Sequence, residues 1–565
     1  MSAGPLFAAA GEPLPASAVA IVLEDGAEVQ AGRRVRPGVP HGYHRLRLRN
    51  GAERDLVIAP RTCFESPDLH GWGWAAQLYA TRSRRSWAMG DLTDLAALCA
   101  WARRCDAGVV QINPLHAVTP GSPQEPSPYF PSSRLFRNPL YLDVERVPGA
   151  AGDREIAALA ADARRLNAKD CIDHDAVFSL KMRALARVWG RFTGDHDFAA
   201  YCERSGETLR LFASFCVLTE RLGRSWRSWP EQYRHPQSRA VARVLSEGTR
   251  RVNFHRWLQW LLEQQLDAAS RDVMVMHDLA VGFSPDGADA WLWQDLLADG
   301  MRIGAPPDTF NTAGQNWGVP PFDPHRLRKA GFAPFRETIR AAMRRDGAIR
   351  IDHVMGLFRQ WWMADGADPR DGVYVRYPSR ELLDIVAIES QRARCTVVGE
   401  DLGTVEAGVR PELQRRGMLT YRVAWFEDRP PLRYPAASLA MLTTHDLPTV
   451  AGVWTGADEL EMEEYAVAVN HAAEHRVRRR LLRLTGARPR ATLDSVIVAA
   501  HASLSRAPSA LVLATLDDAA ASARRPNLPG VPSRPNWCLP LPRTLDQLRR
   551  DPLPRRIAEV MARGR

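Results

Sequence analysis

The positions of apolar and polar residues divide most of the chain into short strands separated by helices. After Asp91, for example, apolar residues recur at helical spacing over residues 92–99, and a strand-like apolar run follows. Strands that alternate with helices form a parallel sheet, and eight of them favour a (β/α)8 TIM barrel of the α/β class. A doubly wound open sheet is the alternative, but its glycine-rich phosphate loop is missing from the sequence. The eight predicted strands lie at residues 75–81, 108–113, 273–278, 348–353, 396–400, 419–424, 441–446 and 510–515.

Two segments depart from this alternation. Residues 1–68 contain three strand-like runs separated by turn residues such as Asn50 and Gly51. Residues 150–270 have a helical pattern rich in tryptophan, and we expect this segment to pack as core and lid, without a cofactor site at its tryptophans. The sequence therefore predicts a small N-terminal β-rich domain at residues 1–68, a barrel domain at residues 69–565 and a helical insertion at residues 150–270 within the barrel.

Composition and charge narrow the class of protein. The chain has 565 residues, of which 45% are hydrophobic and 25% charged. Its net charge of +10 comes mostly from arginines spread over helix-like segments, without a DNA- or RNA-binding signature, so we expect solvated helix faces and no nucleic-acid partner. No apolar run is long enough to span a bilayer, and the first residues lack a secretory signal. These features predict a cytoplasmic protein that is not bound to a membrane.

The cysteines point to a reduced protein without a metal site. None of the eight forms a Cys-x-x-Cys pair, and histidines do not cluster beside them at zinc-finger spacing. In a cytoplasmic protein we expect reduced thiols, most of them buried. The sequence thus supports neither a disulfide framework nor a structural zinc site. The eight residues are Cys63, Cys99, Cys105, Cys171, Cys202, Cys216, Cys395 and Cys538.

The stretch from residue 348 to residue 356 carries the first candidate chemistry. Ile349 and Ile351 alternate with Arg350 and Asp352, which predicts a strand with one apolar and one polar face. Arg350 can then hold Asp352 ionised at neutral pH. An ionised carboxylate at a strand end can act as a nucleophile, and a structural Arg–Asp pair at a sheet edge is the alternative interpretation.

Three predicted strands end in an acid. Asp352 ends the fourth strand, Glu400 the fifth and Asp446 the seventh. Catalytic groups of a TIM barrel lie at the C-terminal ends of its strands, so these carboxyl groups are expected to meet. Two carboxyl groups that flank a sugar linkage can supply a nucleophile and a general acid, and a third can stabilise an oxocarbenium-like transition state. The order of the three acids is therefore compatible with cleavage of glycosidic bonds.

Several motifs resemble those of one enzyme family. The segments Arg350-Ile-Asp-His353, Gly399-Glu-Asp-Leu-Gly403 and Thr444-His-Asp446 resemble the catalytic motifs of the amylomaltases, which are 4-α-glucanotransferases related to the α-amylase clan. The resemblance extends from about residue 71 to residue 537. Further segments that resemble the substrate loops of the family are Ser127-Pro-Tyr129, Asn138-Pro139, Asp289-Ala-Trp291, Gly304-Ala-Pro-Pro-Asp308, Gly314-Gln-Asn-Trp-Gly318, Asn527-Leu-Pro-Gly530 and Pro535-Asn-Trp537.

This resemblance implies a role for each matching residue. Asp352 would be the nucleophile, Glu400 the acid/base and Asp446 the stabiliser of the transition state. Arg350 would support Asp352, and the other residues would contact the sugar units of the substrate. The candidate substrate-binding residues are Arg350, His353, His445, Tyr129, Asp289, Trp291, Asp308, Gln315, Trp317 and Asn527.

The implied activity is retaining transfer of part of an α-1,4-glucan to the 4-hydroxyl of another glucan or of glucose, with maltooligosaccharides, glycogen or starch as substrates. The alternative is an α-1,4-glucan hydrolase that uses the same three acids with water as acceptor. This chemistry requires no metal or organic cofactor. The chain departs from the family pattern at Val531, where a threonine is expected, and in the Cys-Leu-Pro-Leu-Pro segment after Trp537.

Overall fold

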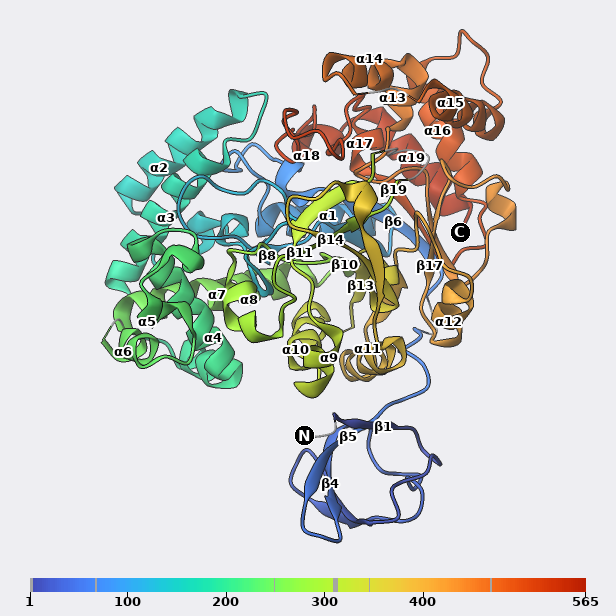
Figure 1. Cartoon of the computed structure of the whole chain (residues 1–565). Coiled ribbons are helices and arrows are strands. Elements are labelled where there is room, and N and C mark those ends of the chain that lie inside the picture. The colour runs from blue at the N-terminus through green and yellow to red at the C-terminus, as the bar shows by residue number, and fades with distance from the viewer. Residues whose placement is uncertain (1–3, 67–68, 248, 308–312, 345, 468–469) are drawn as a thin grey trace.

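Eight parallel strands form the centre of the molecule (Figure 1). The computed structural model describes residues 4–66, 69–247, 249–307, 313–344, 346–467 and 470–565. The strands of the barrel are β6 (Gly71–Ala76), β7 (Val109–Ile112), β10 (Met274–Leu279), β13 (Ala348–Ile351), β16 (Thr396–Gly399), β17 (Thr420–Val423), β18 (Ser438–Met441) and β19 (Leu511–Thr515). Their order is β16-β13-β10-β7-β6-β19-β18-β17, and a parallel bridge between Val398 and Leu419 closes the ring. The TIM barrel predicted from the sequence is confirmed.

Each predicted barrel strand corresponds to one strand of the ring, but two were placed wrongly. The first strand begins at Gly71 and ends at Ala76, whereas residues 78–80 form a short 3-10 helix. A Cβ atom at Gly73 would lie 2.1 Å from the Val109 carbonyl oxygen, so glycine permits the close pairing that the propensity pattern disfavours. The seventh strand ends at Met441, because the chain then turns away and Thr443 bonds the Pro448 carbonyl at 2.9 Å.

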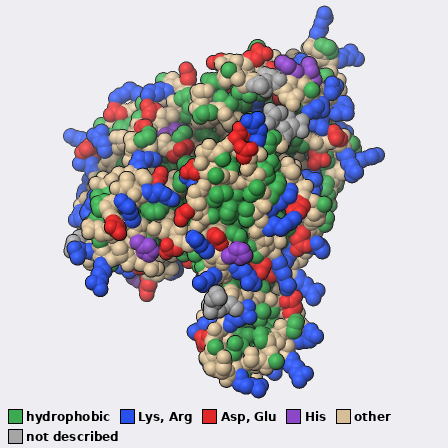
Figure 2. Space-filling view, in the orientation of Figure 1, with side chains coloured by type: hydrophobic (Ala, Val, Ile, Leu, Met, Phe, Trp, Pro, Cys, Tyr) green, Lys and Arg blue, Asp and Glu red, His purple; other side chains and the backbone are tan. Residues whose placement is uncertain are grey.

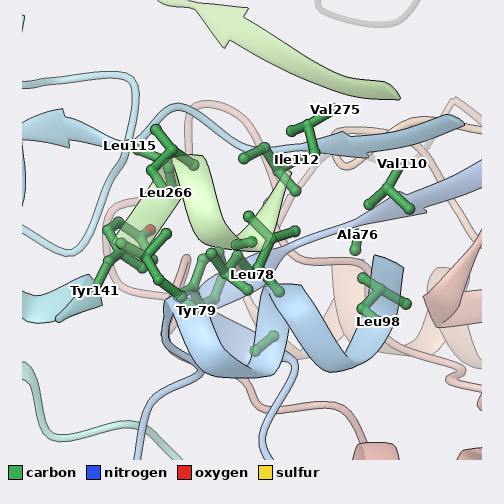
Figure 3. Close-up of a cluster of buried hydrophobic side chains, with 14 of the residues drawn as sticks. Ala76, Leu78, Tyr79, Leu98, Val110, Ile112, Leu115, Tyr141, Leu266 and Val275 are labelled. Carbon is green, nitrogen blue, oxygen red and sulfur yellow. The ribbon is translucent and has the colours of Figure 1, made fainter. Parts of the chain in front are cut away.

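The main hydrophobic core lies between the barrel and its helices. Figure 3 shows part of it, with Leu98 of α1 beside Val110 of β7 and Leu266 of α7 (Thr249–Ala269) beside Leu115. These side chains are buried. Parallel barrel strands require such apolar side chains on the face that the helices cover. The helices around the barrel include α1 (Leu92–Arg104), α9 (Pro324–Lys329), α10 (Ala333–Ala342), α11 (Ser379–Ala393), α12 (Val409–Arg415), α13 (Val450–Thr455), α14 (Ala457–Glu464), α15 (His471–Thr485), α16 (Leu493–Leu504), α17 (Leu516–Ala519), α18 (Leu545–Leu548) and α19 (Pro552–Arg563).

Helices between β7 and β10 gather on one side of the barrel (Figure 1). Trp257 and Trp260 lie on the last of these helices, and Trp226 and Trp229 lie at a 3-10 helix between two of them. These four tryptophans were expected to pack as core, and all are buried. The two longest of these helices, α4 and α7, pack on each other, and α7 also packs on α1. The helices are α2 (Arg154–Arg165), α3 (His174–Arg191), α4 (His196–Leu222), α5 (Glu231–Arg234), α6 (Arg239–Glu247) and α7 (Thr249–Ala269).

Two small antiparallel sheets extend the loops that follow the strands. The four-stranded sheet has the order β12-β11-β14-β15 and follows barrel strands β10 and β13 in the chain. The two-stranded sheet β8–β9 brackets the proline-rich loop at residues 120–131. Their bounds are β8 (His116–Ala117), β9 (Ser133–Arg137), β11 (Met301–Ala305), β12 (Gln315–Val319), β14 (Arg359–Ala364) and β15 (Val373–Arg376), with the short helix α8 (Ala288–Leu292) nearby.

The N-terminal residues form a five-stranded sheet of their own, which lies beside α9, α10 and α11 in Figure 1. The Tyr43 hydroxyl donates a hydrogen bond of 2.8 Å to Glu389 of α11, and the ring of Phe7 packs edge-on against Phe332. We propose that a small N-terminal domain ends at residue 68 and that the barrel domain begins at residue 69. The order is β1-β5-β4-β2-β3, with bounds β1 (Leu6–Ala8), β2 (Ala18–Val22), β3 (Glu28–Gln30), β4 (Gly42–Leu48) and β5 (Glu53–Ile58).

The surface carries mixed charges. Figure 2 shows basic and acidic side chains interspersed over the visible face, including the N-terminal sheet, rather than gathered in one basic band. In the part of the chain that the structure describes, no helix has the length and apolar character needed to cross a membrane.

Candidate active site

Two of the three predicted catalytic acids directly follow barrel strands. Asp352 is the first residue after β13, and Glu400 is the first residue after β16, so both lie at the C-terminal end of the barrel. β13 and β16 are neighbours, with Arg350 opposite Val398 and Ile351 opposite Gly399. Asp446 lies in the loop after β18, beyond the end of the strand on which the sequence placed it.

Arg350 connects these acids. Its Nη2 atom lies 2.8 Å from Oδ1 of Asp352 and 3.9 Å from Oε2 of Glu400. Its Nη1 atom donates to both carboxylate oxygens of Asp278, at 2.8 and 2.9 Å. The Arg350 side chain is only 4% exposed. Its buried positive charge compensates the negative charges of the neighbouring carboxylates, which would otherwise repel one another.

Asp278 is a member of the site that sequence reasoning missed. It lies in the C-terminal part of β10, next to β13, and is buried. The Tyr129 hydroxyl donates a hydrogen bond of 2.6 Å to Asp278, which links the proline-rich loop to Arg350. The signal was available, because the predicted strand at residues 273–278 also ends in an acid. Asp278 thus fixes Arg350 through Nη1, while Asp352 contacts Nη2.

Glu400 is buried and held by the backbone. Its carboxyl oxygens accept hydrogen bonds from the backbone N–H of His353 at 2.8 Å and of Leu402 at 2.6 Å. Burial raises the pKa of Glu400 to about 7, and the neighbouring charge of Asp352 adds to this effect, while Arg350 opposes it. A carboxyl group with this pKa can hold a proton near neutral pH and release it to a substrate.

His353 forms the turn between the two acids. It adopts a left-handed backbone conformation with φ of 46°, which aims its N–H at Glu400. Burial lowers the pKa of its imidazole to about 4, so the ring is neutral at pH 7. The Trp317 ring packs edge-on against it at 5.0 Å, and the Trp317 indole N–H donates to Gln315 at 3.2 Å. The structure thus brings three predicted substrate-binding residues together beside Asp352.

Asp446 is held from two sides. The Asn527 side-chain amide donates a hydrogen bond of 2.7 Å to its Oδ1, and His445 Nε2 lies 3.3 Å from its Oδ2. Burial would raise the pKa of Asp446, but the adjacent His445 and the Asn527 hydrogen bond outweigh it and lower the pKa, so the group stays ionised. Arg525 donates to the Asp446 carbonyl at 2.9 Å and anchors this loop to the buried Asp458. The Asp446 side chain is 42% exposed to solvent.

The aromatic rings of Tyr129, His445 and Trp537 pack together. The rings of Tyr129 and His445 stack with centroids 4.9 Å apart, and Trp537 lies 5.2 Å from Tyr129 and 5.3 Å from His445. Trp537 belongs to a motif noted in the sequence but was not among the predicted site residues. Flat aromatic surfaces of this kind are suitable partners for the apolar faces of sugars.

The remaining predicted residues have other surroundings. Asp289 accepts a hydrogen bond of 2.8 Å from the backbone N–H of Arg134, and Trp291 is 0% exposed and packs on Phe215 and Trp229. Both side chains support neighbouring segments in this structure, and their predicted contact with substrate stays a prediction. Asp308 lies outside the described residues. Within the described ranges, no cluster of three or more His, Cys, Asp or Glu side chains could hold a metal ion.

A TIM barrel with carboxyl groups clustered at the C-terminal ends of adjacent strands is the arrangement typical of an enzyme. Residues 76–545 match the family model described as 4-alpha-glucanotransferase. A 4-alpha-glucanotransferase of Mycobacterium tuberculosis is 42% identical over 560 residues. The match covers 89% of this chain and 76% of that protein. One of Haemophilus influenzae is 36% identical over 460 residues, which cover 74% of this chain and 66% of that protein.

The solved structures agree with the sequence comparisons. The crystal structure of amylomaltase from Corynebacterium glutamicum has a TM-score of 0.87 and 30% sequence identity, and the match covers 99% of this chain and 90% of that chain. The chain belongs to the 4-alpha-glucanotransferase family. The family predicted from the sequence motifs is therefore confirmed, and transfer is favoured over the hydrolase alternative.

Proposed function

We propose that the protein transfers segments of α-1,4-glucans by a retaining mechanism in which Asp352 is the nucleophile and Glu400 the acid/base. Glu400 protonates the oxygen of the leaving glucan while Asp352 attacks the anomeric carbon, which forms a covalent glycosyl-enzyme. Glu400, now ionised, takes the proton from the incoming 4-hydroxyl as that oxygen displaces Asp352. The observation that carries this proposal is the pair of contacts from one Arg350 nitrogen to both carboxyl groups.

These two contacts also limit the distance between the acids. Because the same nitrogen lies 2.8 Å from Asp352 and 3.9 Å from Glu400, the two contacting oxygens are less than about 7 Å apart. Retaining enzymes hold their carboxyl groups roughly 5–5.5 Å apart, whereas inverting enzymes leave roughly 6.5–9.5 Å for a water molecule. The upper limit excludes most of the range of inverting enzymes, and in this way the arrangement supports retention.

We assign Asp446 to the stabilisation of the transition state. Its pKa is lowered, so it is ionised when positive charge develops on the sugar ring. Tyr129 and His445 would support the sugar unit that reacts, and Trp317 would contact a neighbouring unit beside His353. Arg350 orients Asp352, and Asp278 in turn orients Arg350. Glycogen and starch as the natural substrates, and a cytoplasmic location, stay predictions.

The acid role of Glu400 predicts how activity depends on pH. Its pKa is raised to about 7, so the fraction that carries the proton, and with it kcat/KM, should fall tenfold per unit at pH values well above 7. Initial rates of glucose release from maltotriose at low substrate concentration, measured from about pH 5 to pH 9, test this. A kcat/KM that stays constant up to pH 9 would contradict the assignment.

Transfer itself is tested by the products from maltotriose. A transferase should yield glucose together with a ladder of longer maltooligosaccharides, while the number of reducing ends stays nearly constant, because each bond broken is replaced by a new one. Hydrolysis would raise the number of reducing ends as substrate disappears. Chromatography combined with a reducing-end assay separates the two, and a steep rise without any product longer than maltotriose would overturn the proposal.

A further inference from the structure

Two free cysteines from distant parts of the chain meet beside the active site. The Sγ atom of Cys538 lies 3.0 Å from the Sγ atom of Cys171, and its S–H is placed to donate to that sulfur. The two backbones are also joined, because the Ile172 N–H donates a hydrogen bond of 2.7 Å to the Cys538 carbonyl. Residues held in this way satisfy the main requirement for a disulfide, which is that the two backbones already lie close together.

The position of this pair connects it to catalysis. Cys171 lies just before α3, in the helical insertion, and Cys538 directly follows Trp537. Trp537 packs on the rings of Tyr129 and His445 and has a left-handed backbone conformation with φ of 62°. A change at Cys538 is therefore passed to an aromatic ring in contact with the proposed sugar site.

We propose that Cys171 and Cys538 form a redox-sensitive dithiol, which low-molecular-weight disulfides oxidise to a bond that lowers the activity of the enzyme. Both residues are partly exposed, so a small reagent can approach them. The five buried cysteines lack this access, and Cys105 is partly exposed but contacts no second sulfur among the described residues. The structure thus marks out one reactive pair from eight cysteines.

The reaction is a thiol–disulfide exchange in two steps. The thiolate of Cys171 attacks the reagent disulfide, forms a mixed disulfide and releases one thiolate. The sulfur of Cys538 then attacks Cys171, expels the second thiolate and closes the intramolecular bond. The two protons of the cysteines pass to the two released thiolates, so one reagent disulfide is reduced as one protein disulfide forms. Burial and the neighbouring Cys171 raise the pKa of Cys538 to about 12, which disfavours the Cys538 thiolate as the first nucleophile.

Formation of the disulfide between Cys171 and Cys538 requires the two sulfur atoms to move together. A disulfide has a sulfur–sulfur distance of about 2.05 Å, so the two sulfurs must approach by roughly 1 Å from their present separation of 3.0 Å. This movement acts on the residue that directly follows Trp537, whose ring packs on Tyr129 and His445. The expected loss of activity rests on the proposed role of these rings, whereas the chemistry of the dithiol does not.

Mass spectrometry tests the bond without reference to catalysis. The folded full-length protein is incubated with oxidised glutathione, the remaining thiols are alkylated, and the protein is denatured and digested with trypsin. Cleavage gives residues 170–181 and residues 525–543, each with a single cysteine. We expect these two peptides to appear joined, with the loss of two hydrogen atoms, and to separate after treatment with dithiothreitol. Alkylation or glutathione addition on both cysteines, without a joined peptide, would overturn the proposal.

Activity measurements on the same samples test the consequence. Oxidation is expected to lower the rate of maltotriose disproportionation at least about threefold, and dithiothreitol should restore it. Cys171→Ser and Cys538→Ser should both be insensitive to oxidised glutathione, while the matched control Cys105→Ser should respond as the unmodified protein does. Full activity in a fully cross-linked sample, or an equal loss in the serine variants, would overturn control of activity by this pair. A failure of the catalytic assignments would instead show in the Asp352 and Glu400 variants and leave the joined peptide unchanged.

Discussion

Replacement of Asp352 by asparagine is expected to lower kcat for maltotriose disproportionation by about 10⁴-fold or more. Asparagine has nearly the same volume as aspartate, but its amide is a far weaker nucleophile than a carboxylate. No glycosyl-enzyme therefore forms at a useful rate. The fold should persist, because Arg350 keeps both of its hydrogen bonds to Asp278 when the Asp352 charge is removed. Initial rates measured with purified enzyme at saturating maltotriose give kcat directly.

A matched surface substitution controls for the change of charge. Asp365→Asn removes the same charge from an exposed residue that pairs with Arg302 at 2.6 Å, and it should leave kcat unchanged. The circular dichroism spectrum and the melting temperature of the Asp352 variant should remain close to those of the unmodified protein. A rate near that of the unmodified enzyme would show that Asp352 forms only a structural ion pair with Arg350, which is the alternative interpretation of the sequence.

The barrel could be predicted because its signals are local. Each strand is a short apolar run next to a turn or helix signal, and a carboxylate that directly follows such a run must lie at the C-terminal end of the barrel. Asp352 and Glu400 were predicted on this basis. Asp446 was placed on a strand that ends earlier, because nothing in residues 441–446 shows that the chain leaves the sheet after Met441.

The contacts that could not be predicted are those between distant segments. Local spacing suggested the pair of Arg350 with Asp352, but the contact of one Arg350 nitrogen with both carboxylate oxygens of Asp278 joins residues that are far apart in sequence. The meeting of Cys171 with Cys538 leaves no signal at either position, since neither belongs to a Cys-x-x-Cys motif. The backbone hydrogen bond from His353 to Glu400 depends on a left-handed residue that is not a glycine, which propensity rules disfavour.

Replacement of Glu400 by glutamine is expected to lower kcat/KM for maltotriose by about 10²–10⁴-fold, which is the usual contribution of a general acid. The amide cannot donate a proton to the leaving glucan oxygen. Fluoride leaves without protonation, so an α-maltosyl fluoride should form the glycosyl-enzyme in this variant with much less impairment. The rates with the two substrates, measured on one preparation, provide the test.

The ratio of these two rates is more informative than either rate alone. Glutamine presents an NH2 group to a site where Glu400 accepts hydrogen bonds from the backbone N–H of His353 and Leu402, so the variant can lose some correctly folded protein. Such a loss lowers kcat/KM for both substrates by the same factor and cancels in the ratio. Loss of the acid lowers kcat/KM only for maltotriose, because kcat/KM does not include the second step. Because the variant also lacks the base for the second step, the glycosyl-enzyme should accumulate with the fluoride and add the mass of the sugar to the peptide that contains Asp352. Equal impairment with both substrates, and no labelled peptide, would remove Glu400 from the acid/base role.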